Sequence, residues 1–196
     1  MREIDFLRNH VQHLRHVRWF NTMPCLIPMS VAEHSYVTAV IVMLMKGAGD
    51  TPDMLKAALL HDIEEGFTGD LNALAKRMDN GIGKAWKRLK RLTMENIVLE
   101  DAPPEWDLIH FWGMAQNDVL LKAADIVSMW LYCIEEVDLG NNSMRHVCYI
   151  AENWLWKLKD EHDWLEPWVA AIATENAFRE IHETDVPASL HYVLNA

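Results

Sequence analysis

The chain has 196 residues, of which 51% are hydrophobic and 24% are charged. This length and composition provide for one hydrophobic core, so they exclude a disordered chain and predict a single domain over residues 1–196. The net charge of −11 argues against an exposed binding face for a nucleic acid polymer, which requires a surplus of Lys and Arg.

The cysteines and the apolar segments predict the cellular location. Cys25, Cys133 and Cys148 are widely spaced and form no C-x-x-C pair, which is typical of reduced thiols in the cytoplasm. The first residues are too charged for a signal peptide, and no apolar run reaches the roughly 18 residues of a membrane-spanning helix. We therefore expect a cytoplasmic protein without a membrane partner.

Apolar residues recur at helical spacing along the chain, which predicts an all-α fold, a bundle of seven or more helices. In the first predicted helix, Ile4, Leu7, Val11 and Leu14 trace one face. We expect this face to pack against the core.

The second predicted helix begins at Ser30 and runs to about Lys46. Ser30 and Glu33 have the spacing of a capping box, in which each side chain accepts a hydrogen bond from a free backbone N–H at the helix start. His34 therefore falls in the first turn of this helix.

The third predicted helix opens at Thr51-Pro52-Asp53, where a capping residue precedes a proline, and ends near Gly66. It carries the dipeptide His61-Asp62. Further helices are predicted over residues 71–77, 83–99, 117–137, 144–159 and 165–182. The helix at 83–99 is basic, and we interpret its charged residues as a solvated face: Lys84, Lys87, Arg88, Lys90 and Arg91.

Four polar residues interrupt separate apolar helices: His34, His61, Asp62 and Asp125. Asp125 follows Ala123-Ala124 and precedes Ile126, so a helix would bury it, and a buried carboxylate is costly unless it is paired or coordinated. Adjacent His and Asp diverge by about 100° within a helix, but at a helix end both can turn onto one ion. Imidazoles with carboxylates suit Mn²⁺, Fe²⁺, Co²⁺ or Mg²⁺. The four residues therefore predict one divalent metal site.

The order of these residues resembles the H…HD…D pattern of the HD-domain metal-dependent phosphohydrolases, and within them the bacterial 5'-deoxynucleotidases. The resemblance spans about residues 14–145 and rests on further matching segments: Arg18-Trp19, Glu65, Gly69-Asp70-Leu71, Lys122-x-Ala124-Asp125, and the stretch Leu131 to Glu136 followed by Gly140-Asn141-Asn142. One departure is Asn72-Ala73-Leu74, which stands where the family commonly has P-x-P, and it changes the expected pocket wall.

The resemblance implies a role for each matching residue. His34, His61, Asp62 and Asp125 would hold one divalent ion, Co²⁺, Mn²⁺, Mg²⁺ or Fe²⁺. Glu65 would serve as general acid and base toward the attacking water, whereas Glu64 is expected to be a solvated glutamate at a helix end. Asp70 would contact the sugar 3'-hydroxyl or assist proton transfer. The remaining residues expected to contact the substrate are Arg18, Trp19, Leu71, Asn72, Ala73 and Lys122.

Three functions stay open from the sequence. The first is a 5'-deoxynucleotidase, which removes phosphate from 2'-deoxynucleoside monophosphates. The second is a deoxynucleoside triphosphate triphosphohydrolase, which a basic channel reaching Lys76, Arg77 or Lys84 would favour. The third is a non-catalytic nucleotide-sensing protein with the same fold. The amphipathic helices near the C-terminus further suggest a homodimer or a higher homo-oligomer.

Overall fold

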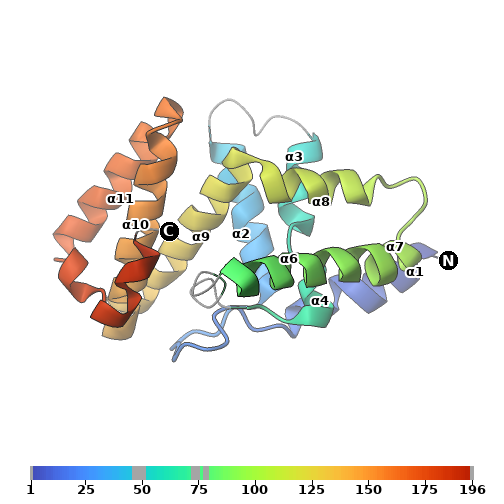
Figure 1. The fold of residues 1–196 in the computed structure, drawn as a ribbon, viewed down its shortest axis with the longest axis horizontal. Helices are drawn as coiled ribbons and strands as arrows, with labels where there is room; N and C mark the ends of the chain where they lie inside the picture. The colour runs from blue at the N-terminus through green and yellow to red at the C-terminus, as the bar shows by residue number, and fades with distance from the viewer. Residues whose placement is uncertain (1, 46–51, 72–75, 77–79, 195–196) are drawn as a thin grey trace.

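The computed structural model of the chain describes residues 2–45, 52–71, 76 and 80–194 (Figure 1). These residues form an all-α fold, as predicted, and contain no β-strand; Arg18 and Ser30 form one isolated antiparallel bridge. The α-helices are α1 (Arg2–Phe6), α2 (Val31–Leu44), α3 (Pro52–Leu60), α4 (Glu65–Thr68), α6 (Asn80–Thr93), α7 (Leu99–Asp101), α8 (Leu108–Asn117), α9 (Val119–Asp138), α10 (Arg145–Lys159) and α11 (Glu166–Phe178). No described helix is both long and apolar enough to cross a bilayer.

Short turns of other helix types connect these elements. Two π-helical turns cover Leu7–Val11 and Met94–Val98. The 3-10 turns cover His13–Arg15, Asn142–Met144, Asp163–Leu165, Glu183–Asp185 and Ala188–Val193.

The long helix α9 is the centre of the arrangement. It packs against α2 on one side and α10 on the other, and α11 lies along α10 (Figure 1). α3 packs between α2 and α8, and α6 contacts α4. Segments far apart in the sequence therefore meet along α9.

The buried apolar residues form two clusters. The larger one joins α2, α3, α9, α10 and α11. The smaller one contains Phe6, Ile63, Met94, Val98 and Leu108, and it ties the turn after α3 to the segment that joins α6 to α8. Because Ile63 is fully buried in the second cluster, it fixes the turn on which His61 and Asp62 lie.

The predicted capping box at the start of α2 is confirmed. The Ser30 hydroxyl accepts a hydrogen bond from the Glu33 backbone N–H at 3.3 Å, and the Glu33 carboxylate accepts one from the Ser30 backbone N–H at 2.7 Å. These bonds satisfy two donors that a helix start otherwise leaves without partners.

Three predictions about helices were wrong. α3 ends at Leu60, not near Gly66, and the chain turns before the short helix α4. In the first segment Ile4 and Leu7 are exposed, while Phe6, His10 and Leu14 are buried, because the chain changes from α to π and 3-10 geometry there and rotates the buried face.

The third error is α8, which the sequence analysis did not predict. Its N-cap is Asp107, whose carboxylate accepts a hydrogen bond from the His110 backbone N–H at 3.2 Å. The helix predicted over residues 71–77 falls mostly outside the described residues.

Candidate metal centre

His34 reaches the centre of the molecule from the first turn of α2, and its side chain is fully buried. Its Nδ1 lies 3.0 Å from the Ser128 hydroxyl on α9, and its Nε2 faces Nε2 of His61. The indole of Trp19 stacks on the imidazole at 3.8 Å between ring centroids. The ring is therefore held from two sides.

His61 is the first residue after α3. Its Nδ1 lies 2.8 Å from the carbonyl oxygen of Ala58, and since a carbonyl only accepts, this nitrogen carries the proton. When the imidazole is neutral, the lone pair is therefore on Nε2, which faces His34. Histidines that bind metals are commonly oriented by such a bond at the second ring nitrogen.

Three ligand atoms, one each from His34, His61 and Asp125, lie within 4.8 Å of one another. The two Nε2 atoms are 3.3 Å apart, and Asp125 Oδ1 is 3.0 Å from Nε2 of His34. Two nitrogens that share one ion at about 2.1 Å each lie roughly 3 Å apart, so this arrangement fits a bound metal ion.

Asp62 lies beside this group and outside the set of three. Its Oδ2 is 3.0 Å from Nε2 of His61, and its Oδ1 is 2.9 Å from the ammonium of Lys90. One carboxylate oxygen thus faces the histidines and the other faces a lysine.

The charges around the histidines stabilise positive charge. Burial alone lowers the pKa of His61, but Asp62, with a contribution from Asp125, raises that pKa to about 9. Burial alone would raise the pKa of Asp62, yet the charges of His61 and Lys90 hold it well below its usual value. A pocket that retains a proton on a buried imidazole also favours a cation.

Glu65 begins α4 and is 1% exposed. Burial and the neighbouring charge of Asp62 raise its pKa well above the usual value. Its Oε1 accepts a hydrogen bond from Lys90 at 3.2 Å, while its Oε2 is buried and has no hydrogen-bond partner among the described residues. Such an orphaned acceptor indicates a missing ligand or water.

Glu64 and Lys90 differ from the predictions. Glu64 is fully buried: its Oε2 accepts a hydrogen bond from the Trp112 indole at 2.9 Å, and its Oε1 lies 2.7 Å from the Lys90 ammonium. Lys90 is 7% exposed and does not belong to a solvated face. The signal was present in the sequence, because Trp86, Lys90 and Met94 are spaced by four residues and share one face of a helix.

A cavity of about 500 Å³ opens beside these groups. His61, Asp62, Glu65 and Asp125 line it, and the side chains of Lys76 and Lys122 add positive charge. The lining also includes apolar residues of α9 and α10, none of which was predicted as a site residue: Ile126, Met129, Val147, Ile150 and Trp154. The cavity is thus lined by both charged and apolar side chains.

Trp19, Asp70 and Leu71 also line the cavity. Asp70 Oδ2 accepts a hydrogen bond from the Phe20 backbone N–H at 3.3 Å, and its Oδ1 is 4.0 Å from Nζ of Lys76. Burial raises the pKa of Asp70 above its usual value.

The structure does not bring every predicted substrate contact to the cavity. Arg18 is exposed and is not among the lining residues, although the adjacent Trp19 is. Asn72 and Ala73 lie outside the described residues. Their predicted contacts remain predictions.

The comparisons with known proteins agree with this geometry. Residues 6–163 match the model of the YfbR-like 5'-deoxynucleotidase family. The chain is 25% identical over 151 residues to 5'-deoxynucleotidase YfbR of Salmonella typhi, covering 68% of this chain and 75% of that protein. It is 27% identical over 156 residues to 5'-deoxynucleotidase VP0926 of Vibrio parahaemolyticus, covering 72% of this chain and 79% of that protein.

Two solved structures share the fold. A conserved hypothetical protein from Pyrococcus furiosus aligns with a TM-score of 0.69 at 20% identity, over 87% of this chain and 99% of that one. The PH0347 protein from Pyrococcus horikoshii aligns with a TM-score of 0.69 at 19% identity, over 88% of this chain and 99% of that one. With the family model matching most of its length, the chain belongs to the YfbR-like 5'-deoxynucleotidase family.

Proposed function

We propose that this chain is a metal-dependent 5'-deoxynucleotidase that converts a 2'-deoxynucleoside 5'-monophosphate and water into a deoxynucleoside and phosphate. One observation carries the proposal: the cluster of His34, His61 and Asp125 opens on a cavity that also contains Glu65. The names of the relatives support the same substrate class.

In this proposal His34, His61, Asp62 and Asp125 hold one divalent ion. The mixed nitrogen and oxygen donors suit Mn²⁺, Co²⁺, Fe²⁺ or Mg²⁺. When bound, the ion offsets the charge of the phosphoryl group and lowers the pKa of water at the site.

The other residues position the substrate and manage protons. Oε2 of Glu65 is free to accept a proton from the attacking water, and the same group can return a proton to the O5' leaving group. Lys122 and Lys76 line the cavity and would contact phosphate oxygens. The base would pack against apolar lining residues such as Met129 and Ile150, and Trp19 would restrict space near the 2' carbon.

The proposal is tested by incubating the purified protein with dAMP, dGMP, dCMP, dTMP and AMP in the presence of Co²⁺, Mn²⁺ or Mg²⁺. We expect one phosphate and one deoxynucleoside per turnover from the deoxynucleotides, and much slower release from AMP. Asp62→Ala should abolish turnover while the circular dichroism spectrum stays helical. Absence of turnover with every nucleotide and metal, or full activity of Asp62→Ala, would contradict the proposal.

A second candidate is hydrolysis of deoxynucleoside triphosphates to a deoxynucleoside and triphosphate. The observation that favours it is the position of Lys76, which lines the cavity and adds positive charge beyond the metal ligands. Lys84, the other lysine of the predicted channel, is exposed and does not line it. Chromatography of the products from dATP separates the two candidates, because only the second releases intact triphosphate.

A further inference from the structure

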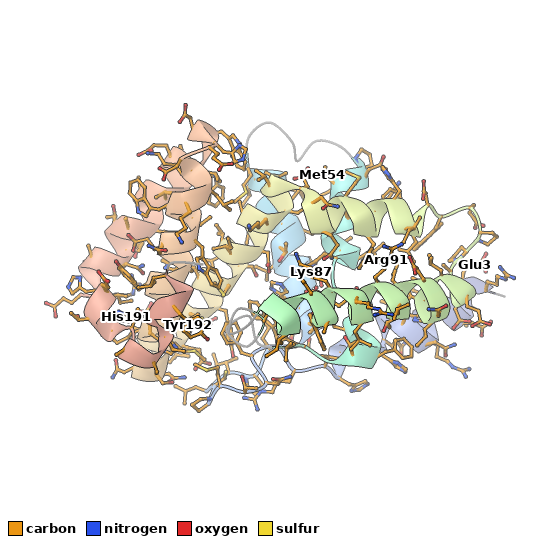
Figure 2. All side chains as sticks on the ribbon, viewed as in Figure 1. Glu3, Met54, Lys87, Arg91, His191 and Tyr192 are labelled. Carbon is orange, nitrogen blue, oxygen red and sulfur yellow. The ribbon has the colours of Figure 1, made fainter. Side chains whose placement is uncertain are left out.

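Lys90 is buried although it lies on a basic helix. It projects from the face of α6 that carries Trp86 and that continues to Met94 in the following π-helical turn, and it is 7% exposed. Lys87, three residues before it, and Arg91, one residue after it, are exposed; both are labelled on α6 in Figure 2. A lysine loses much hydration on burial, so its ammonium requires strong partners.

The ammonium of Lys90 has three such partners. Its Nζ lies 2.9 Å from Asp62 Oδ1, 2.7 Å from Glu64 Oε1 and 3.2 Å from Glu65 Oε1. The ammonium donates hydrogen bonds to Asp62 and Glu65, and its contact with Glu64 Oε1 is a close ion pair without hydrogen-bond geometry. The lysine thus contacts one oxygen of every carboxylate in the His61–Glu65 turn.

The arrangement fixes where the second oxygens lie. With Oδ1 of Asp62 held by Lys90, Oδ2 is the oxygen beside His61, at 3.0 Å from its Nε2. With Oε1 of Glu65 held, Oε2 is the buried oxygen without a partner, on a residue that lines the cavity. The lysine itself is held in turn, because Trp112 donates to the other oxygen of Glu64.

We propose that Lys90 is a positioning residue that orients Asp62 toward the metal ion and Glu65 toward the attacking water, with Glu64 and Trp112 as its fixed support. The inference rests on the proposed function. It brings α6 into the site: the helix carries no proposed metal ligand, but Lys90 lines the cavity. Lys90 acts through geometry: its three short contacts select one oxygen of each carboxylate.

The test compares Lys90→Met with Lys87→Met. Both remove one positive charge from α6 and retain an unbranched apolar side chain, but Lys87 is exposed and does not line the cavity. The two readouts are the visible absorption spectrum of the Co²⁺-loaded protein, which reports the ligand geometry, and kcat and KM for dAMP.

For Lys90→Met we expect kcat to fall about 10- to 100-fold, with a smaller change in KM, and the Co²⁺ bands to shift in position and intensity. Lys87→Met should match the wild type in both. A Lys90→Met protein with wild-type kcat would overturn the proposal, and so would a reduced kcat with an unchanged Co²⁺ spectrum, which would place Lys90 on the substrate instead. If the wild type hydrolyses no nucleotide, the proposed function fails, but the Co²⁺ spectra still test Lys90.

A chemical rescue separates positioning from a folding defect. Lys90→Ala removes the atoms that propylamine contains, so propylamine should restore part of kcat and the wild-type Co²⁺ spectrum, whereas propanol should not. Failure of propylamine to restore either readout would count against the proposal. If Lys90→Met does not fold, the double variant E64Q/K90M replaces it, because it removes one of the buried carboxylates that would lose their partner. The double variant is then compared with E64Q in the same two readouts.

Discussion

Each imidazole of the candidate metal centre is oriented through the ring nitrogen that faces away from it. His61 uses the carbonyl of Ala58, and His34 uses the hydroxyl of Ser128. The first contact depends only on the helix end, whereas the second is made by a side chain and can be removed by mutation. Ser128 therefore offers a way to test the centre without changing a proposed ligand.

We predict that Ser128→Ala weakens Co²⁺ binding by about 10- to 100-fold, because His34 loses the partner that fixes its ring. Isothermal titration of the metal-free protein with Co²⁺ measures the affinity. Ser35→Ala is the matched control: Ser35 is buried next to His34, but its hydroxyl has no hydrogen-bond partner among the described residues. Equal Co²⁺ affinities for the two variants would show that the Ser128 contact does not orient His34.

His10 provides a pH-dependent contribution away from the metal centre. It is fully buried between the rings of Phe6 and Phe67, and its Nε2 lies 3.0 Å from Asp101 Oδ2. Burial lowers the pKa of His10 below 6.5 despite the opposing effect of Asp101, and His13 lowers it further. The unfolded chain therefore binds a proton at His10 more readily than the folded protein does.

It follows that the free energy of unfolding decreases as the pH falls through about 6.5, since protons then favour the unfolded state. In His10→Phe this part of the decrease is absent. Urea unfolding of the wild type and of His10→Phe between about pH 8 and about pH 5 measures this contribution. The reference is the difference between their free energies of unfolding at about pH 8, where His10 is neutral in the folded and the unfolded state. The prediction fails if the two free energies change in parallel with pH.

At the scale of elements, one glutamate of α9 holds the segment that delivers Trp19 and Phe20 to the cavity. Glu136 is fully buried and accepts hydrogen bonds from the backbone N–H groups of Leu26 and Ile27 at 2.8 and 2.7 Å. Burial alone would raise its pKa, but these bonds and one from Asn141 lower it. The carboxylate thus fastens residues 26–27 to the C-terminal half of α9.

We predict that Glu136→Gln lowers the free energy of unfolding by about 1–3 kcal/mol, because one of its two acceptor oxygens becomes a donor facing a backbone N–H. KM for dAMP should rise as well, since Trp19 lies next to the released segment. Glu135→Gln, an exposed neighbour with the same change in charge, should stay within about 0.5 kcal/mol of the wild type. Urea unfolding and steady-state kinetics measure the two effects, and equal stabilities of both variants would contradict the assignment.

The elements also show what the sequence could predict. Local signals were sufficient where one short pattern determines the structure, as in the capping box of Ser30 and Glu33. They failed where tertiary packing decides: α3 ends at Leu60 because the buried Ile63 draws the following turn into the second apolar cluster. α8 was not predicted, although Asp107 is the kind of residue that caps a helix start.

In the candidate site, too, some residues could be predicted from the sequence and others could not. The four proposed ligands are detectable as polar residues among apolar helical ones. Lys90 and Glu64 were misassigned because each looks like a surface residue until its partner is known: they lie 26 positions apart in the chain (90 − 64) and meet only in the folded protein, at 2.7 Å. The helical spacing of Trp86, Lys90 and Met94 indicates that Lys90 is buried, but nothing local identifies the carboxylates that pair with it.

At the scale of the whole molecule, the candidate centre joins three distant parts of the chain. His34 comes from α2, His61 from the end of α3 and Asp125 from α9, and their ligand atoms converge within 4.8 Å. The unfolded chain does not hold these atoms together. A cation that binds them therefore favours the native state and stabilises the whole fold.

We predict that Co²⁺ or Mn²⁺ raises the melting temperature of the metal-free protein. At a free metal concentration of about 100 times Kd the stabilisation is about 2.7 kcal/mol, which corresponds to roughly 5–10 °C for a chain of this size.

The chain carries a net charge of −11, so divalent cations could also stabilise it by relieving general repulsion. Asp125→Ala separates the two effects, because it removes a proposed ligand but keeps nearly all of the net charge. Differential scanning calorimetry with and without metal should show the increase in the wild type and lose most of it in Asp125→Ala; an increase of the same size in both proteins would assign the stabilisation to surface charge and not to the site.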